Sequence, residues 1–149
     1  MKRVLSSLLL ATALLSAPAI HAAGQATQDE AKAFAIKAAE YLKAVGPEKA
    51  FPEFNRAGGP WIDRDLYVIV SNTDHVVLAD GGNASLIGHN TSSLKDVDGV
   101  SIAAQISALQ GEGWVKYKWL DPVTKKVEPK AVYWVNVNGY HVGVGAYVP

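Results

Sequence analysis

The chain has 149 residues, no cysteine, and 14 basic against 14 acidic side chains. This length is typical of a single domain. The absence of cysteine excludes disulfides, thiolate metal ligands and a cysteine nucleophile. Hydrophobic residues make up 49% and charged residues 19% of the chain, values that are ordinary for a globular domain. We therefore expect one domain held together by its own hydrophobic core.

The first 22 residues have the pattern of a secretory signal peptide. Lys2 and Arg3 form a positive start, residues 4–17 carry no charge, and small residues surround an expected cleavage site after Ala22 or one residue later. The alternative is an uncleaved membrane anchor, but this apolar run is short against the roughly 20 residues that span a bilayer. We therefore expect a periplasmic or secreted domain of residues 23–149, with no membrane attachment after cleavage.

Cleavage also changes the charge of the protein. Removing the first 22 residues leaves 12 basic against 14 acidic side chains, a net charge of −2. A negative domain has no general electrostatic attraction to nucleic acid. We therefore expect no nucleic-acid partner.

A long amphipathic helix is predicted at the start of the mature chain. Thr27 and Glu30 have the spacing of a capping box. Apolar residues then follow at helical spacing: Phe34, Ala38, Tyr41, Leu42 and Val45. Gly46 and Pro47 end this helix, and Pro47 can start a short second helix over residues 48–55.

The rest of the chain is predicted to be mainly β-strand. Strands are expected at 66–71 and 75–79, followed by a surface loop at 80–99, a helix at 101–109, and strands at 114–120, 130–136 and 141–148. Short turns, among them Asn138-Gly139, join neighbouring strands. This order favours an antiparallel sheet in an α+β fold.

Enzyme signatures are missing from the sequence. It has no nucleophile elbow, phosphate-binding loop, dinucleotide fingerprint or zinc-protease motif. His75, His89 and His141 lie far apart, so isolated histidines are favoured over metal ligands. Residues 96–99 resemble part of a calcium loop, but the twelfth ligand position holds Gln105 in place of a carboxylate. We expect no enzymatic activity, cofactor or metal.

Aromatic and basic residues gather near the C-terminus. Seven of the 13 aromatic residues lie in residues 114–149, where five lysines face only two acids. Strand alternation puts Tyr117 and Trp119 on one face of their strand, and separates Lys130 from Tyr133 on the next. Gly143 and Gly145 leave a strip without side chains, where a helix or a ligand can approach closely.

Two interpretations of this region remain open. In one, the aromatic residues are ordinary strand residues and the lysines serve solubility. In the other, they form a small concave site with aromatic walls and a lysine for an anionic group. Composition alone favours the first interpretation.

Several segments together resemble the extracytoplasmic Cache family, in its single-Cache form. The matching segments are Trp61–Tyr67, Leu86–Asn90, Leu94–Asp96, Asp98-Gly99, Gly113–Trp119, Asp121–Thr124, Pro129–Tyr133 and Gly143–Tyr147. The resemblance covers nearly the whole mature chain. It implies a PAS-like antiparallel sheet of about five strands, with the long N-terminal helix packed on one face and a ligand pocket on the other.

The resemblance also implies a function and candidate residues. Such domains sense small molecules, often short carboxylates or amino acids, for membrane receptors and kinases. The candidate lining residues are Tyr67, Tyr117, Trp119, Lys130 and Tyr133. Lys130 would pair with a carboxylate, Tyr67 and Tyr133 would donate hydrogen bonds, and Trp119 would form an apolar wall. Because alternation separates Lys130 from Tyr133, both reach one ligand only if a bulge or a strand end intervenes.

Two departures from the family pattern affect this expectation. Relatives often have a His-Pro-like segment after the second strand, where this chain has Asp80, and an acid near the pocket can change the ligand preference or prevent anion binding. The chain ends at Pro149 with no signalling module, so we expect a membrane receptor as partner. The leading hypothesis is an exported domain that binds a small organic ligand. A ligand-free interaction module ranks second and a small periplasmic enzyme third.

Overall fold

The structure, a computed structural model, describes residues 24–148. The predicted signal peptide lies outside these residues. Two helices come first, α1 (Gln28–Val45) and α2 (Pro47–Asn55). They are followed by strands β1 (Ile62–Asp63), β2 (Leu66–Asn72) and β3 (Val77–Asp80), the short 3-10 helix η1 (Ala84–Leu86) and helix α3 (Ile102–Ser107). Strands β4 (Glu112–Leu120), β5 (Val127–Val137) and β6 (Tyr140–Tyr147) complete the fold.

The strands form one antiparallel sheet, as predicted. Its main order is β3-β2-β6-β5-β4, and the two-residue strand β1 pairs with the start of β2. The α+β class and the PAS-like arrangement are confirmed. Strand β1 was not predicted, because two residues are too few for a periodic pattern. The strand predicted at 75–79 is β3, which begins at Val77 rather than His75, because His75 has φ 60° and belongs to the turn before the strand.

Helix α1 covers one face of the sheet and starts where the sequence predicted. Thr27 accepts a hydrogen bond from the Glu30 backbone, and the Glu30 side chain accepts one from the Thr27 backbone, which completes the capping box. The buried stripe of α1 consists largely of alanines, which let the helix approach closely. It packs against aliphatic residues of β2 and β6 such as Val68 and Val144. This is the helix face of the sheet.

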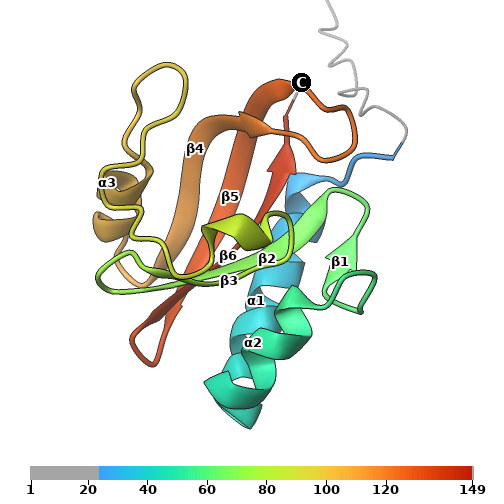
Figure 1. Ribbon diagram of the computed structural model, residues 1–149, viewed down its shortest axis with the longest axis vertical. Coiled ribbons are helices and arrows are strands. Elements are labelled where there is room, and N and C mark those ends of the chain that lie inside the picture. Colours follow the sequence, from blue (N-terminus) through green and yellow to red (C-terminus); the bar gives the residue numbers. More distant parts are fainter. Residues whose placement is uncertain (1–23, 149) are drawn as a thin grey trace, which may run out of the picture.

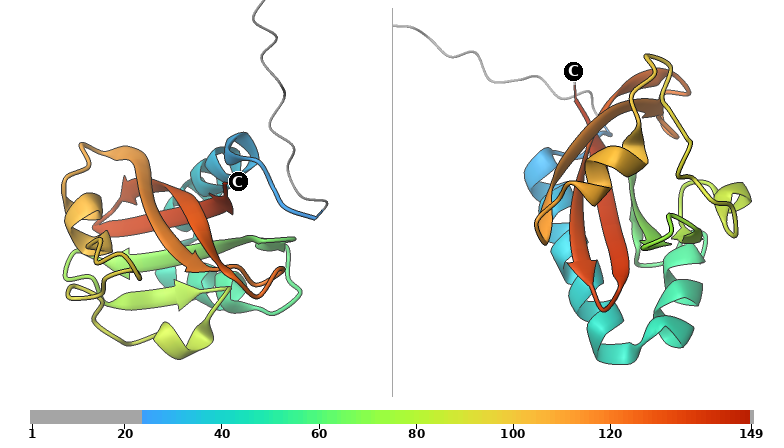
Figure 2. Two further views of the ribbon diagram at one scale, coloured as in Figure 1. Left: turned by 90° about the horizontal axis from the view of Figure 1, so that it is seen from above. Right: turned by 90° about the vertical axis from the view of Figure 1, so that its left-hand side faces the viewer.

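The other face of the sheet is covered by residues 81–107, here called the cover segment. It contains η1 and α3, and in Figure 1 η1 lies in front of the sheet while α1 lies behind it. The views in Figure 2 show the same layers from above and from the side. The cover segment therefore forms the third layer of the molecule.

Hydrogen bonds fix the cover segment to both edges of the main sheet. At the β3 edge, the Val77 backbone N–H donates to His89 O over 3.0 Å. At the β4 edge, the Lys118 backbone N–H donates to Asp96 Oδ2 over 2.8 Å, and the Gln105 side chain bonds both backbone groups of Lys116. Because these bonds occupy the free edges, the predicted surface loop becomes a structured lid over the sheet.

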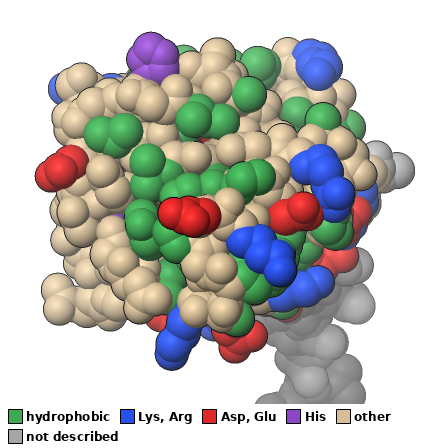
Figure 3. Space-filling model, turned by 60° about the horizontal axis from the view of Figure 1, so that its bottom comes forward, with side chains coloured by type: hydrophobic (Ala, Val, Ile, Leu, Met, Phe, Trp, Pro, Cys, Tyr) green, Lys and Arg blue, Asp and Glu red, His purple; other side chains and the backbone are tan. Residues whose placement is uncertain are grey.

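No helix within residues 24–148 is long and apolar enough to cross a membrane. The face shown in Figure 3 has hydrophobic side chains near its centre, with acidic and basic side chains close together beside them. This face lacks the continuous basic surface that binding to a phosphate backbone requires.

Candidate ligand cavity

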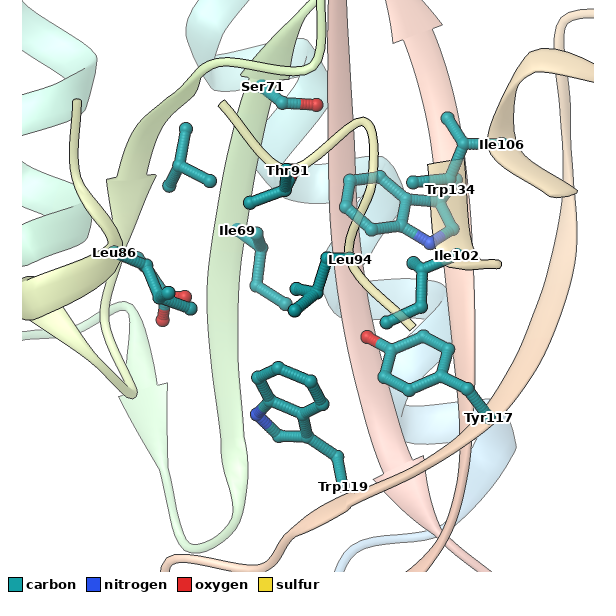
Figure 4. Close-up of a pocket in the computed structure, with 12 residues that line it drawn as sticks. Ile69, Ser71, Leu86, Thr91, Leu94, Ile102, Ile106, Tyr117, Trp119 and Trp134 are labelled. Carbon is teal, nitrogen blue, oxygen red and sulfur yellow. The ribbon is translucent and has the colours of Figure 1, made fainter. Parts of the chain in front are cut away.

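A small cavity lies between the sheet and the cover segment. Its volume is about 50 Å³, room for about three to five water-sized groups. The sheet contributes seven of the lining residues drawn in Figure 4, from β2, β4 and β5 and from the start and end of β3; those labelled there include Ile69, Ser71, Tyr117, Trp119 and Trp134. The cover segment contributes Leu86, Thr91, Leu94, Ile102 and Ile106.

Two polar atoms of this lining are completely buried and have no hydrogen-bond partner among the described residues. They are the indole Nε1 of Trp134 and the hydroxyl Oγ of Ser71, and both side chains are at least 96% buried. A buried polar group that forms no hydrogen bond costs roughly 1–3 kcal/mol. Native proteins rarely leave such groups unsatisfied, so these two atoms are the unusual feature of the lining.

Asp80 is the one charged residue that lines the cavity. One carboxylate oxygen, Oδ1, accepts hydrogen bonds from the backbone N–H groups of Gly82 (2.9 Å) and Asn83 (2.8 Å). The backbone N–H of Asp80 donates to Asn55 Oδ1 on α2. Burial raises the pKa of the Asp80 carboxyl, while these N–H donors and the charge of Lys130 act in the opposite direction. The other oxygen, Oδ2, has no hydrogen-bond partner within residues 24–148.

A buried lysine lies beside the cavity. Lys130 is 1% exposed, and its ammonium donates a hydrogen bond of 2.7 Å to the Tyr67 hydroxyl. The same nitrogen lies 4.0 Å from the ring centroid of Tyr67 and 4.9 Å from that of Tyr147. Burial lowers the pKa of Lys130 to about 7, although nearby carboxylates, Asp80 first among them, favour its charged form. Lys130 itself does not line the cavity.

The two glycines of β6 make room for these side chains. A Cβ on Gly143 would lie 2.7 Å from the Trp134 ring, and one on Gly145 would lie 2.7 Å from Cε of Lys130. The strip without side chains is therefore filled by side chains of the neighbouring strand β5. The expectation that a helix or a ligand would approach the strip directly was wrong.

A broader hollow adjoins the cavity on the outside. It has a volume of about 450 Å³ and is lined by Tyr67, Gly82, Asn83, Trp119, Leu120, Pro122 and Lys125. Trp119 is the one residue that lines both spaces. The Tyr67 ring packs directly under Gly82, where a Cβ would come within 2.4 Å of it.

The comparison with protein families decides the membership of the chain. A family model described as single Cache domain 2 matches residues 10–148. The chain belongs to this Cache family. The match begins within the segment predicted as a signal peptide and continues to the last described residue. Among curated proteins, no sequence matches the chain.

Three solved structures have a similar fold. A methyl-accepting chemotaxis protein from Vibrio parahaemolyticus matches with a TM-score of 0.69 and 20% identity, over 80% of this chain and 87% of that one. A Cache chemosensory domain studied for carboxylic acid recognition matches with a TM-score of 0.66 and 22% identity, over 81% and 92%. The periplasmic sensor domain of a chemotaxis protein matches with a TM-score of 0.56 and 19% identity, over 81% and 90%.

The Cache fold brings together most of the site residues expected from the sequence. Asp80, Tyr117 and Trp119 line the cavity. Tyr67 and Lys130 lie on the same face of the sheet and bond each other beside it. Tyr133 lies on the helix face, where it packs with Trp114. The centroid of its ring lies 4.8 Å from Nζ of Lys32 on α1. No bulge brings Tyr133 to the cavity, because β5 pairs in continuous register along its length.

Several lining residues were not expected from the sequence. Trp134 lies on the same face of its strand as Lys130, and this alternation was a usable signal. That its indole N–H lacks a hydrogen-bond partner can be seen only in the structure. Ser71 lies at the end of a hydrophobic strand and had no distinguishing pattern. Leu86 and Leu94 are among the few apolar residues of a polar loop, and their presence there was the available hint that the loop covers the sheet.

Proposed function

We propose that this Cache domain is exported and binds a short polar organic ligand, a small carboxylate or an amino-acid-like molecule, in the cavity beneath the cover segment. The observation that carries the proposal is the pair of buried, unpartnered polar atoms on Trp134 and Ser71. A ligand of a few non-hydrogen atoms matches the volume and supplies the missing partners. The carboxylic acid recognition named for one structural neighbour supports the same ligand class.

We propose roles for four of the other candidate residues in or beside the cavity. Trp119 and Tyr117 form aromatic walls, and the Tyr117 hydroxyl, which points into the space in Figure 4, can donate or accept a hydrogen bond. Lys130 and Tyr67 form a rigid polar base next to the ligand. Lys130 acts on the ligand through its electric field, since its hydrogen bond goes to Tyr67.

The two alternative functions have less support. A ligand-free interaction module would be expected to satisfy its buried polar atoms internally, and Trp134 and Ser71 are not satisfied in this way. An enzyme would need several acid–base groups directed at one space, whereas Asp80 is the sole carboxylate of the lining, and the lining has no histidine. Cache domains are ligand-binding sensor modules, so we expect no catalytic activity.

A binding screen tests the proposal. Short carboxylic acids, amino acids and amines are added to the purified mature protein, and binding is measured by calorimetry and by the shift in melting temperature. In Ser71→Ile a larger side chain fills the cavity and should abolish the binding seen with the wild type. The matched control is Ser93→Ile, which makes the same change at an exposed position of the cover segment. Equal binding by the two variants would place the ligand elsewhere.

Export and the receptor partner need their own measurements. Cell fractionation and the mass of the mature protein should show a periplasmic or secreted chain that starts at Ala23 or Gly24. We further propose that the domain presents its ligand to a membrane receptor. Crosslinking in whole cells, with and without the ligand found in the screen, should give a ligand-dependent adduct with a membrane protein. A cytoplasmic chain of full length would contradict the export proposal.

A further inference from the structure

We propose that Asp80 makes the cavity a site for a protonated amine, so that its ligand is a short amino acid rather than a simple carboxylic acid. This inference rests on the proposed function and narrows its ligand class. Three observations carry it: the charge of the lining, the hydrogen-bond state of each polar atom in it, and the position of Lys130.

The lining is acidic, not basic. Asp80 is its one charged member, and within residues 24–148 its carboxylate forms no ion pair. Its Oδ1 is held by the backbone of Gly82 and Asn83, which leaves Oδ2 for a ligand. A buried carboxylate gains most from a cation that also donates hydrogen bonds, which is the chemistry of a primary ammonium group.

Lys130 does not neutralise this acid by contact. Its ammonium is engaged by the Tyr67 hydroxyl and lies over the rings of Tyr67 and Tyr147. Lys130 is also absent from the lining, so it is not positioned to hold a ligand carboxylate directly. A simple carboxylate in the cavity would therefore lie near the negative charge of Asp80. Such a ligand has no ammonium group that could offset the repulsion.

The other polar atoms of the lining are suited to bind the carboxylate of an amino acid. The indole N–H of Trp134 is a donor only, the Ser71 hydroxyl is unpartnered, and the Tyr117 hydroxyl reaches the same space. These three neutral donors can receive a carboxylate without adding charge to the site. The Asp80 carboxylate and the neutral donors come from different strands, β3 on one side and β2, β4 and β5 on the other.

The volume limits the length of the molecule. Space for about three to five water-sized groups holds glycine, which has five non-hydrogen atoms. Alanine and β-alanine, with six, are the upper limit, and longer or branched side chains are excluded unless the cover segment moves. The expected ligand therefore has an ammonium group and a carboxylate separated by one or two carbons.

The test compares pairs of ligands that differ in the amine. Calorimetry on the purified mature protein measures glycine against acetate, and alanine and β-alanine against propionate. We expect the amino acid of each pair to bind about 10- to 100-fold more tightly, the range that one charged hydrogen bond provides. Propionate binding as tightly as both alanines, or more tightly, would overturn the inference and leave the proposed function intact. If no member of any pair binds to the folded protein, the proposed function fails as well.

A variant assigns the selectivity to Asp80. Asp80→Asn keeps an oxygen for the Gly82 and Asn83 N–H groups but removes the charge, so alanine binding should weaken by about 10-fold or more while propionate binding stays the same or improves. The matched control is Asp96→Asn, because Asp96 also accepts backbone hydrogen bonds in the cover segment but does not line the cavity. Unchanged selectivity in folded Asp80→Asn overturns the assignment. If Asp80→Asn does not fold, the inference is tested with Trp134→Phe. This variant should weaken the binding of alanine and leave the binding of ethylamine unchanged.

Discussion

The two faces of the sheet are built from alternate residues of the same strands, yet they differ in almost every physical property. On the helix face, β2 and β6 present aliphatic residues such as Val68 and Val144 to the alanine stripe of α1. On the cavity face, the same strands present Tyr67 and Ser71 next to two glycines. One face is a dry core, and the other holds a buried lysine, a carboxylate and unpartnered donors. Stability and binding are thus assigned to opposite sides of one sheet, and substitutions on each side should separate them.

The largest effect is expected on the helix face. Leu42 of α1 is 2% exposed, and Leu42→Ala removes buried methyl groups, so the free energy of unfolding should fall by about 2–4 kcal/mol. Ligand affinity of the folded protein should not change. Denaturant unfolding and calorimetry on the same sample check both parts. Lys43→Ala, at the neighbouring exposed position, is the control and should change stability by less than about 0.5 kcal/mol.

A second prediction concerns the buried lysine of the cavity face and its dependence on pH. The pKa of Lys130 is about 7 in the folded protein, against about 10.4 when unfolded. Between these values the unfolded chain binds more protons than the folded one, so stability rises with pH. From pH 7 to pH 9 the free energy of unfolding should increase by about 2 kcal/mol from this residue. Below pH 7 this contribution should level off.

Lys130→Met identifies the source of that slope. The variant has no ammonium to bury, so denaturant unfolding between pH 7 and pH 9 should lose the increase. Lys116→Met is the matched control, because Lys116 lies on β4 with an exposed side chain and its removal should leave the slope in place. A slope that persists in Lys130→Met would show that Lys130 is hydrated and that the cavity face is wetter than the structure indicates.

A third prediction isolates the unpartnered indole. Trp134→Phe keeps an aromatic ring but removes the N–H, so ligand affinity should weaken by about 1 kcal/mol, the value of one neutral hydrogen bond. Trp114→Phe removes an indole N–H from a tryptophan that packs on the helix face against Tyr133. Calorimetry should find its affinity equal to the wild type. An equal loss in both variants would mean that the effect is transmitted through the sheet and that the faces are not independent.

Helices and strands that have a local sequence pattern could be predicted from the sequence. Structure that depends on contacts between residues far apart in the sequence could not. The capping box at Thr27 and Glu30 located the start of α1, and the alternation of β4 correctly put Tyr117 and Trp119 on one face. The helix predicted at 101–109 is present as α3, but the segment predicted as a surface loop at 80–99 is a structured part of the cover segment. Its structure depends on hydrogen bonds to β3 and β4, with Asp96 bonding Lys118 across 22 residues. Such partners have no periodicity. Strand alternation had also separated Lys130 from Tyr133, and the structure follows that alternation.

The smallest effects are expected when the hydroxyl is removed from each of two tyrosines that lie on opposite faces of the sheet. Tyr117 and Tyr133 are both almost fully buried, but the first lines the cavity and the second packs beneath α1. Tyr117→Phe should weaken ligand binding by about 0.5–1 kcal/mol, since it removes one hydrogen-bonding group. Tyr133→Phe should leave affinity within the error of the titration, and calorimetry on both variants measures the difference. If Tyr133→Phe weakens binding as much as Tyr117→Phe, the hydroxyl beneath α1 is coupled to the ligand, and a movement of α1 would then be part of how this Cache domain responds to binding.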